Sequence, residues 1–290
     1  MIYLRSFTFP CDDTETSFIQ SIIRTCYDSF YPFKILSRND LSRLDFDTVT
    51  ILYGGNGSGK STALNVIAEK AGISRDSIYN KSNFFSDYVN YCGMSLEEKI
   101  TQNSRIITSD DVFDYMLNIR NLNEGIDLKR EEIFEEYLDA KYSKFQLKSM
   151  ADYEQLKKVN NSRRRTQSRY VRGELIDNVR EYSNGESGFR YFTEKIEENG
   201  LYLLDEPENS LSPKRQIELV RFLEDSARFF GCQFIISTHS PFLLAMRGAR
   251  IYNLDHNPVE VERWTNLDNV RTYYDFFKSH EGEFRQGSEF

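Results

Sequence analysis

The sequence lacks several features that mark particular classes of protein. No apolar run approaches the roughly 18 residues that a membrane-spanning helix needs, so we expect no membrane insertion. Residues 1–9 lack the basic-then-apolar pattern of a secretion signal. The four cysteines are scattered and form no C-x-x-C pair, which favours reduced thiols over a disulfide framework or a zinc site. Together these absences predict a cytoplasmic protein.

An excess of basic residues is also missing, because the formal net charge is −8. This balance argues against a general nucleic-acid-binding protein, whose domains are usually basic. In contrast, hydrophobic residues make up 39% and aromatic residues 14% of the 290 residues, which is too much apolar material for a disordered chain. The length predicts one or two domains.

Short apolar segments rich in β-branched residues alternate with helical patterns in both halves of the chain. They predict buried strands at 48–53, 201–204, 233–237 and 250–254. Helices are predicted after the first three strands, over 61–70, 213–230 and 241–246. Strands that alternate with helices predict an α/β fold with a mainly parallel sheet.

A polar, mostly helical segment over 76–181 separates the two halves of this pattern. We predict that it is a helical insertion within a single α/β domain that covers 1–290, rather than a separate linked domain. The last four residues, 287–290, resemble a cloning remnant and carry no weight in the interpretation.

A glycine-rich loop joins the first predicted strand to its helix. It fits the pattern G-x-x-x-x-G-K-[ST] and consists of Gly54, Gly55, Asn56, Gly57, Ser58, Gly59, Lys60, Ser61 and Thr62. Glycines let successive backbone N–H groups surround a phosphate, and the helix start adds further N–H groups and a positive dipole end. Lys60 is predicted to reach the β- and γ-phosphates, and Ser61 to bind Mg²⁺. A plain glycine turn is the alternative, but the strand before it and the helix after it favour a nucleotide.

Two further predicted strands end in residues that suit nucleotide hydrolysis. Strand 201–204 is followed by Asp205, a candidate Mg²⁺ ligand, and by Glu206, a candidate base for the attacking water. His239 comes just after strand 233–237, at the sheet edge where ligands bind in parallel sheets. We expect it to contact the γ-phosphate and to position the water. An exposed Asp-Glu turn and a structural histidine are the alternatives to these roles.

A small, polar turn precedes the acidic strand. Ser183, Asn184, Gly185 and Glu186 lead into a predicted helix with an apolar face, so the turn offers a second helix start to a phosphate. On its own, this S-N-G-E pattern is more often a simple helix cap.

The order of these motifs resembles that of the ABC-type ATPases over residues 1 to about 265. In that family the S-x-G-E turn is the signature motif, which completes the ATP site of a second subunit. The resemblance implies a P-loop NTPase fold of the ABC-ATPase head type, with ATP and Mg²⁺ as ligands. It also implies a homodimer that holds two ATP molecules head to tail. Each site then combines the phosphate loop, Asp205, Glu206 and His239 of one chain with Ser183 to Glu186 of the other.

Three details resemble the SMC-related bacterial ATPases of the AAA-family branch more than transporter subunits. They are Asn56 in the phosphate loop, the segment 205–213, and Ser240 after His239. Transporter subunits usually carry an S-A-L-D loop, where this chain has Ser-Leu-Ser at 210–212, and Asp after the histidine.

This resemblance implies an ATP-driven switch that turns over slowly without its partner and gates an effector protein, as in phage-defence loci. The ATP-binding subunit of a membrane transporter is the alternative. A third interpretation is a nucleotide-binding module with little hydrolysis, which Glu206 argues against. Too few residues follow His239 to form an additional nuclease domain.

One position of the family pattern differs. Transporter relatives carry a glutamine after a middle strand, where it contacts Mg²⁺ and senses the γ-phosphate. Here strand 105–108 is followed by Ser109, Asp110 and Asp111, and Asp110 is the candidate for that place. The alternative is that Ser109 or Asp110 caps the following helix. Upstream, Tyr31 and Phe33 are candidates for stacking on adenine, although a core position is the favoured interpretation of both.

A basic segment lies within this acidic chain. Between Lys141 and Arg172 there are ten Lys and Arg residues against two acidic residues. The part from Lys157 to Arg172 resembles the arm of SMC-like ATPases that carries coiled coils and meets DNA, although no long heptad run is present. Three interpretations stay open: contact with nucleic acid, docking of an acidic partner protein, or a solvated helix face near the ATP.

Overall fold

The computed structural model describes residues 1–23, 26–143, 153–174 and 184–286. The chain divides into two compact units, one formed by residues 1–113 and 184–290 and the other by residues 114–183. Among the helices that the structure describes, none has the length and apolar character that a membrane crossing requires.

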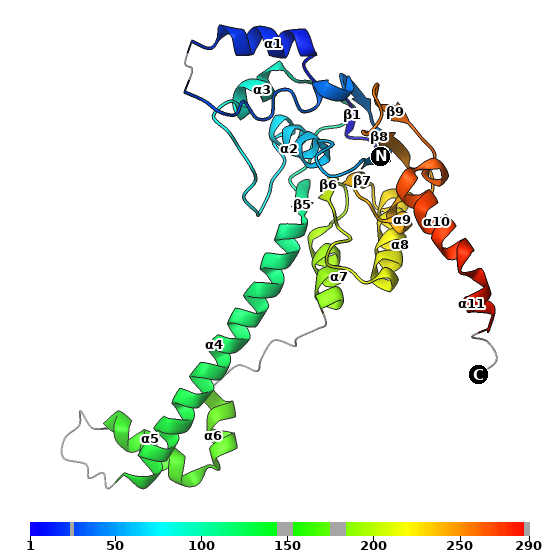
Figure 1. The fold of residues 1–290 in the computed structure, drawn as a ribbon. Helices are drawn as coiled ribbons and strands as arrows, with labels where there is room; N and C mark the ends of the chain where they lie inside the picture. Colours follow the sequence, from blue (N-terminus) through cyan, green and yellow to red (C-terminus); the bar gives the residue numbers. More distant parts are fainter. Residues whose placement is uncertain (24–25, 144–152, 175–183, 287–290) are drawn as a thin grey trace. The chain divides into compact units, whose positions relative to one another are not determined.

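A six-stranded sheet forms the centre of the first unit (Figure 1). Its strands are β3 (Val49–Tyr53), β5 (Arg105–Thr108), β6 (Leu201–Asp205), β7 (Gln233–Ser237), β8 (Arg250–Asn253) and β9 (Glu260–Val261). They lie in the order β5-β6-β7-β3-β8-β9, and every neighbouring pair is parallel except β8 and β9. The predicted α/β fold with a mainly parallel sheet is therefore confirmed.

The central strands are buried because their residues are apolar on both faces, as expected for a parallel sheet covered by helices on both sides. Helix α2 (Lys60–Ala71) contacts β5, β6 and β7, whereas α8 (Pro213–Phe229) packs on β7. Figure 1 shows these two helices on opposite sides of the strands. The other helices of this part are α7 (Asn184–Lys195), α9 (Pro241–Leu244), η3 (Trp264–Asn266), α10 (Asp268–Ser279) and α11 (Glu281–Gln286).

A smaller antiparallel sheet packs beside the first one. Its three strands lie in the order β2 (Arg43–Asp45), β1 (Leu4–Thr8) and β4 (Gly93–Leu96). With it lie α1 (Asp12–Ser21), η1 (Ser37–Asn39) and α3 (Phe85–Tyr91). One apolar cluster extends from this sheet to α2 and to the central strands, so the two sheets share a core.

Gln233, at the start of β7, ties the two sheets together through its side chain. Its Oε1 accepts hydrogen bonds from the backbone N–H groups of Tyr3 (2.8 Å) and Leu4 (2.9 Å). Its Nε2 donates to the carbonyl oxygens of Leu4 (2.8 Å) and Asp47 (3.2 Å). Because Gln233 is fully buried, no water can replace these bonds if the side chain is lost.

The second unit is helical. It contains the greater part of α4 (Ser109–Tyr142), together with α5 (Tyr153–Arg164) and α6 (Gln167–Glu174). A small core of Ile133, Tyr137, Tyr170 and Val171 joins α4 to α6.

The extent of this unit differs from the helical insertion predicted over 76–181. The unit begins at Asp114, because β4 pairs with β1 and β5 pairs with β6, and these pairings keep residues before 114 in the first unit.

We expect Gln233→Leu to lower the free energy of unfolding by about 3 kcal/mol or more, because each buried backbone group left unpaired costs about 1–3 kcal/mol. Urea unfolding followed by the fluorescence of Trp264, the single tryptophan of the chain, measures this change in the first unit. Gln102→Leu, at an exposed position, is the control and should change the value by less than about 0.5 kcal/mol. An equally small effect of Gln233→Leu would contradict the importance of this tie.

Candidate active site

The loop between β3 and α2 has the backbone geometry of a phosphate cradle. The φ angles of Gly57 (+82°) and Gly59 (+96°) lie in the left-handed region, which glycine adopts without strain. A Cβ atom on Gly59 would lie 2.7 Å from Cδ2 of Leu36, so a side chain has no room there. Helix α2 begins at Lys60 directly after this turn, which puts the unpaired N–H groups and the positive end of the helix dipole at the loop.

Lys60 places a buried ammonium group inside the loop. Its Nζ donates to the carbonyl oxygens of Gly54 (2.7 Å) and Gly55 (3.0 Å), which leaves one of its three donors for a phosphate. Burial lowers the pKa of Lys60 below its usual value, and the nearby carboxylates of Glu206 and Asp205 oppose this shift. The loop therefore offers a fixed positive charge to an anion.

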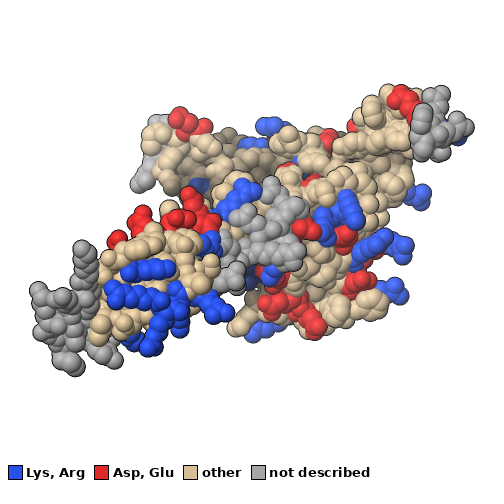
Figure 2. Space-filling model, turned by 90° about the horizontal axis from the view of Figure 1, so that it is seen from below, with Lys and Arg blue, Asp and Glu red and all other residues tan. Residues whose placement is uncertain are grey.

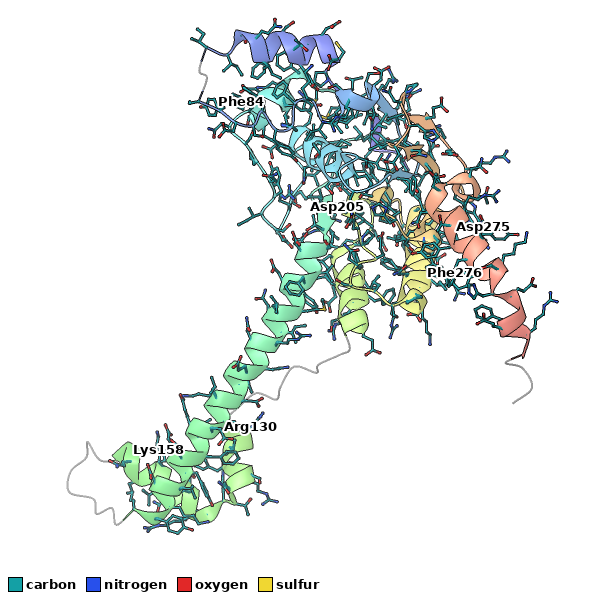
Figure 3. The ribbon with its side chains drawn as sticks, in the orientation of Figure 1. Phe84, Arg130, Lys158, Asp205, Asp275 and Phe276 are labelled. Carbon is teal, nitrogen blue, oxygen red and sulfur yellow. The ribbon has the colours of Figure 1, made fainter. Side chains whose placement is uncertain are left out.

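Asp205 and Ser61 meet where β6 and α2 approach each other. The Oγ of Ser61 donates a hydrogen bond to Oδ1 of Asp205 over 3.1 Å. Burial raises the pKa of Asp205, while the hydrogen bond from Ser61 lowers it. Figure 3 shows Asp205 in the interior of the first unit, at the carboxyl end of β6.

The pair of Asp205 and Ser61 fits a Mg²⁺ ion. Carboxylate and hydroxyl oxygens are hard ligands, and Mg²⁺ usually takes only one or two protein ligands beside water and phosphate oxygens. Within the described ranges, no group of three or more His, Cys, Asp or Glu side chains could hold a metal. A Mg²⁺ ion at this pair would therefore depend on the phosphates of a bound nucleotide.

Glu206 follows Asp205 with an unusual backbone. Its φ angle is +48°, a conformation that costs a non-glycine residue about 1–3 kcal/mol. The N–H of Glu206 donates to the carbonyl oxygen of Ser237 (2.9 Å), and Nδ2 of Asn209 donates to Oε2 of Glu206 (2.8 Å). These contacts hold the carboxylate at the sheet edge.

His239 lies beside this carboxylate. Its Nε2 is 3.8 Å from Oε1 of Glu206 and, within the part of the chain that the structure describes, forms no hydrogen bond. Burial and then the charge of Lys60 lower the pKa of His239, while Glu206 raises it. The net shift is downward, which favours the neutral imidazole. A neutral ring can donate or accept a hydrogen bond at a phosphate or a water.

A cavity of about 270 Å³ opens in front of these groups. Lys60, Ser61, Glu206 and the loop glycines Gly57 and Gly59 line it together with Asn56, Thr62, Ile35 and Arg38. Lys60, Ser61 and Glu206 thus face one space, and Ile35 with Arg38 forms another part of its wall.

The two aromatic residues considered for adenine lie elsewhere. Phe33 is buried in the core and stacks on Phe18 with ring centroids 4.5 Å apart, as its core interpretation predicted. Tyr31 is half-buried, and its hydroxyl donates to Oγ1 of Thr62 over 3.3 Å. Neither lines the cavity, where Ile35 and Arg38 are found instead.

Asp110 lies exposed in the first turn of α4. The predicted cap, Ser109 or Asp110, is wrong in detail, because Thr108 and Asp111 form the reciprocal hydrogen bonds of a capping box. Oδ2 of Asp111 accepts from the N–H of Thr108 (2.7 Å), and Oγ1 of Thr108 accepts from the N–H of Asp111 (3.4 Å). Thr108 lies opposite Asp205 in the pairing of β5 with β6, so Asp110 comes two residues after the end of the strand next to β6. Its role as a Mg²⁺ ligand stays a prediction.

The S-N-G-E turn is described only in part. Ser183 lies outside the described residues, and α7 begins with Asn184 and Gly185. Oε1 of Glu186 accepts a hydrogen bond from Nη2 of Arg215 on α8 over 2.9 Å. The carboxylate of Glu186 is therefore tied to α8 of its own chain.

The sequence analysis missed two acidic residues that touch the site. Oε1 of Glu208 accepts from the N–H groups of His239 (2.6 Å) and Ser240 (3.1 Å). Both carboxylate oxygens of Asp255 lie 2.8 Å from the N–H of Gly55, in the phosphate loop. Each residue follows the carboxyl end of a parallel strand, β6 or β8, which is the signal that singled out His239.

Sequence comparison relates the chain to two families. The model of the family described as ABC transporter matches residues 41–209, which is more than half of the chain. A second model, for an AAA domain described in connection with the AbiEii toxin of Type IV TA systems, matches residues 178–245. No curated protein sequence matches this chain.

Several solved structures are similar over most of the chain. The Smc head domain of Pyrococcus furiosus, bound to the C-terminal domain of ScpA, is 12% identical with a TM-score of 0.42, and the match covers 97% of this chain and 100% of that one. The SMC head domain of Thermotoga maritima is 13% identical, with coverages of 90% and 99% and a TM-score of 0.39. The ATP-binding cassette MJ0796, bound to ADP and Pi, is 14% identical, with coverages of 77% and 88% and a TM-score of 0.36.

The segment matched by the ABC transporter model includes both the phosphate loop and the acidic strand β6. That range includes Lys60, Asp205 and Glu206 of the site described above. The chain therefore belongs to the ABC family of P-loop ATPases and contains their ATP-binding domain.

Proposed function

We propose that this protein is an ATP-hydrolysing switch, in which ATP joins two chains head to tail and hydrolysis releases them. The observation that carries the hydrolytic part is the convergence of Lys60, Asp205, Glu206 and His239 at one sheet edge. These residues come from the ends of β3, β6 and β7, which are adjacent and parallel.

Each of these residues has a role that its surroundings support. Lys60 and the loop N–H groups neutralise the phosphates, and Glu206 orients the attacking water and accepts its proton as the bond from the γ-phosphorus to ADP breaks. His239, in the neutral form that its lowered pKa favours, donates a hydrogen bond to the γ-phosphate or the water. Mg²⁺, held by Ser61 and Asp205, would supply charge stabilisation when bound.

Dimerisation is supported by the motif order and by the position of the S-N-G-E turn at the start of a helix. In this arrangement Ser183 to Glu186 of one chain meet the ATP held by the other. If ATP favours the dimer by about 10⁴-fold, the population changes from about 1:99 to 99:1. Turnover by a single chain is then slow, because half of the site is supplied by the second chain.

The switch acts, in this proposal, on a partner effector of the kind found in phage-defence loci, and it works in the cytoplasm. The second candidate function is the ATP-binding subunit of a membrane transporter, which the description of the matching family favours. Ser240 after His239 and Ser-Leu-Ser at 210–212 favour the switch over the transporter subunit.

The second unit supplies a surface for an anionic partner. Figure 2 shows Lys and Arg side chains gathered over its helices. Exposed basic residues lie on and between α5 and α6, and they include Lys157, Arg163, Arg164, Arg165 and Arg169. A few are engaged within the unit: Lys158 pairs with Glu136 (3.2 Å), and Arg163 donates to the carbonyl oxygen of Ser143 (3.0 Å). Three consecutive exposed arginines favour nucleic acid as the partner.

We expect Glu206→Gln to reduce ATP turnover by about 10²–10⁴-fold, because the amide cannot accept the proton of the water. The variant should still bind ATP and accumulate as an ATP-bound dimer. Phosphate release measures the rate, and the mass in solution with and without ATP–Mg²⁺ measures assembly. Removal of Mg²⁺ with a chelator should prevent the dimer. Wild-type turnover by Glu206→Gln would contradict the role of Glu206, and an unchanged mass would contradict the ATP-dependent dimer.

Lys60→Ala should weaken ATP binding by about tenfold or more, since it removes a buried positive charge whose loss costs at least about 1.4 kcal/mol of binding free energy. Titration calorimetry with ATP measures the affinity directly. Lys70→Ala, near the other end of the same helix, is the control and should bind ATP as the wild type does. Equal affinities of all three proteins would argue against phosphate binding by this loop.

The triple variant R163Q/R164Q/R165Q should bind short double-stranded DNA more weakly. The magnitude of the slope of log affinity against log salt concentration should decrease by about 0.9 for each DNA phosphate that the variant no longer neutralises. The matched control replaces three exposed basic residues of α8, Lys214, Arg221 and Arg228, with Gln. Fluorescence anisotropy at several salt concentrations provides the data. Equal slopes for the two triple variants would exclude this surface as the nucleic-acid site and favour an acidic protein partner.

A further inference from the structure

We propose that Glu208 is a positioning residue that fixes the imidazole of His239 beside Glu206. Its carboxylate binds the backbone of the loop that carries the histidine, rather than the histidine ring itself. This inference rests on the proposed ATPase function for its effect on turnover, but the positioning can also be measured without ATP.

The contact is short and joins two loops that are distant in the sequence. Glu208 follows β6, and His239 follows the neighbouring strand β7, 31 residues later. One carboxylate oxygen, Oε1, accepts hydrogen bonds from the consecutive N–H groups of His239 (2.6 Å) and Ser240 (3.1 Å). Two donors that share one acceptor fix the peptide plane between them, and this plane sets the direction in which the side chain of His239 leaves the backbone.

The other side of the same backbone is also held. Nδ2 of Asn269, on α10, donates to the carbonyl oxygen of His239 over 2.6 Å. Ser240 caps α9 and donates through Oγ to Oε1 of Gln216 (2.7 Å). The backbone of His239 is thus fixed on both sides, whereas its Nε2 has no hydrogen bond among the described residues. A fixed backbone and a ring nitrogen without a hydrogen bond are expected of a side chain that is positioned to bind a ligand.

Part of the Glu208 carboxylate is buried at a cost that the hydrogen bonds to Oε1 offset. The side chain of Glu208 is half-buried, and its second oxygen, Oε2, is buried without a hydrogen bond to any described residue. A buried ionised group destabilises the fold unless hydrogen bonds compensate it. Burial accordingly raises the pKa of Glu208, while the N–H group of His239 lowers it.

The same short segment holds the catalytic base. Asn209, the next residue, donates through Nδ2 to Oε2 of Glu206 (2.8 Å). Residues 206–209 therefore orient the carboxylate of Glu206 through Asn209 and the imidazole of His239 through Glu208. In this proposal, both contacts maintain the 3.8 Å separation between Glu206 Oε1 and His239 Nε2.

The first test observes the ring of His239 directly by NMR. The chain has only three histidines, so the spectrum contains few imidazole signals. The signal that is lost in H239A is that of His239. In E208A, without ATP, we expect the signal of His239 to shift and its pKa to rise toward the ordinary value, because the ring is no longer held in its buried position. E208Q keeps an acceptor oxygen and should retain the wild-type signal.

The matched control for this test is E224A. Oε1 of Glu224 also accepts a backbone N–H, that of Arg247 (2.8 Å), but away from the cavity. We expect E224A to leave the His239 signal unchanged. A wild-type His239 signal in E208A would overturn the inference, whatever the ATPase activity of the protein.

The second test measures steady-state ATP hydrolysis. We expect E208A to lower kcat by about 10–100-fold, as a misplaced group does, with KM for ATP within about twofold of the wild type. E208Q should recover most of the rate. The double variant E208A/H239A should be no slower than H239A, because both changes remove the same interaction. If the losses of kcat caused by E208A and H239A multiply in the double variant, the inference is overturned. If the wild-type protein does not hydrolyse ATP, the proposed function is contradicted, and the NMR result alone decides the role of Glu208.

Discussion

The parallel alignment of β3, β6 and β7 is the constraint on which the site depends. These strands come from segments up to about 190 residues apart, yet their backbone ladders bring all their carboxyl ends to one edge. At that edge the loop after β3 supplies Lys60, the loop after β6 supplies Asp205 and Glu206, and the loop after β7 supplies His239. A shift of one strand by one residue would turn its side chains to the other face and separate the hydroxyl of Ser61 from Asp205.

Charge balance is the second constraint at this edge. Four carboxylates, those of Asp205, Glu206, Asp255 and Glu208, lie around the buried ammonium group of Lys60. Burial raises the pKa of Asp205 and Glu208 and lowers that of Lys60, so every one of these shifts opposes the charged form. Hydrogen bonds from Ser61 and from the N–H groups of His239 and Ser240 compensate part of this cost. The remaining desolvation cost lowers the stability of the fold at this edge. In return, charged groups are present where phosphate, metal and water are proposed to bind.

The sequence predicted the parts of the fold and site that depend on local pattern. The glycine loop, the buried strands and the strand-end residues could be found because each combines a residue type with a periodicity. Glu208 and Asp255 also follow strand ends, but their roles could not be assigned, because each binds a backbone N–H group and any residue except proline can supply one. The cap of α4, given at Ser109 or Asp110 as the alternative to a Mg²⁺ ligand, lies one or two positions earlier, because Thr108 belongs to both the strand and the capping box. The core position favoured for Tyr31 and Phe33 depends on packing of their rings on Phe85 and Phe18, and sequence pattern alone does not show which rings pack together.

Residues 206–209 link the side chains of Glu206 and His239 to one short segment. Glu206 accepts a hydrogen bond from the amide of Asn209 and holds a strained backbone, while Glu208 holds the backbone of His239. Both contacts involve the same four-residue segment, which leads through Leu211 and Ser212 into α8. Helix α8 in turn carries Arg215, the partner of Glu186 at the start of α7. Covalent continuity and three side-chain contacts thus connect the strand-end residues to the start of α7. In the proposed dimer, the groups that hydrolyse one ATP and the turn that contacts the other would therefore share these supports.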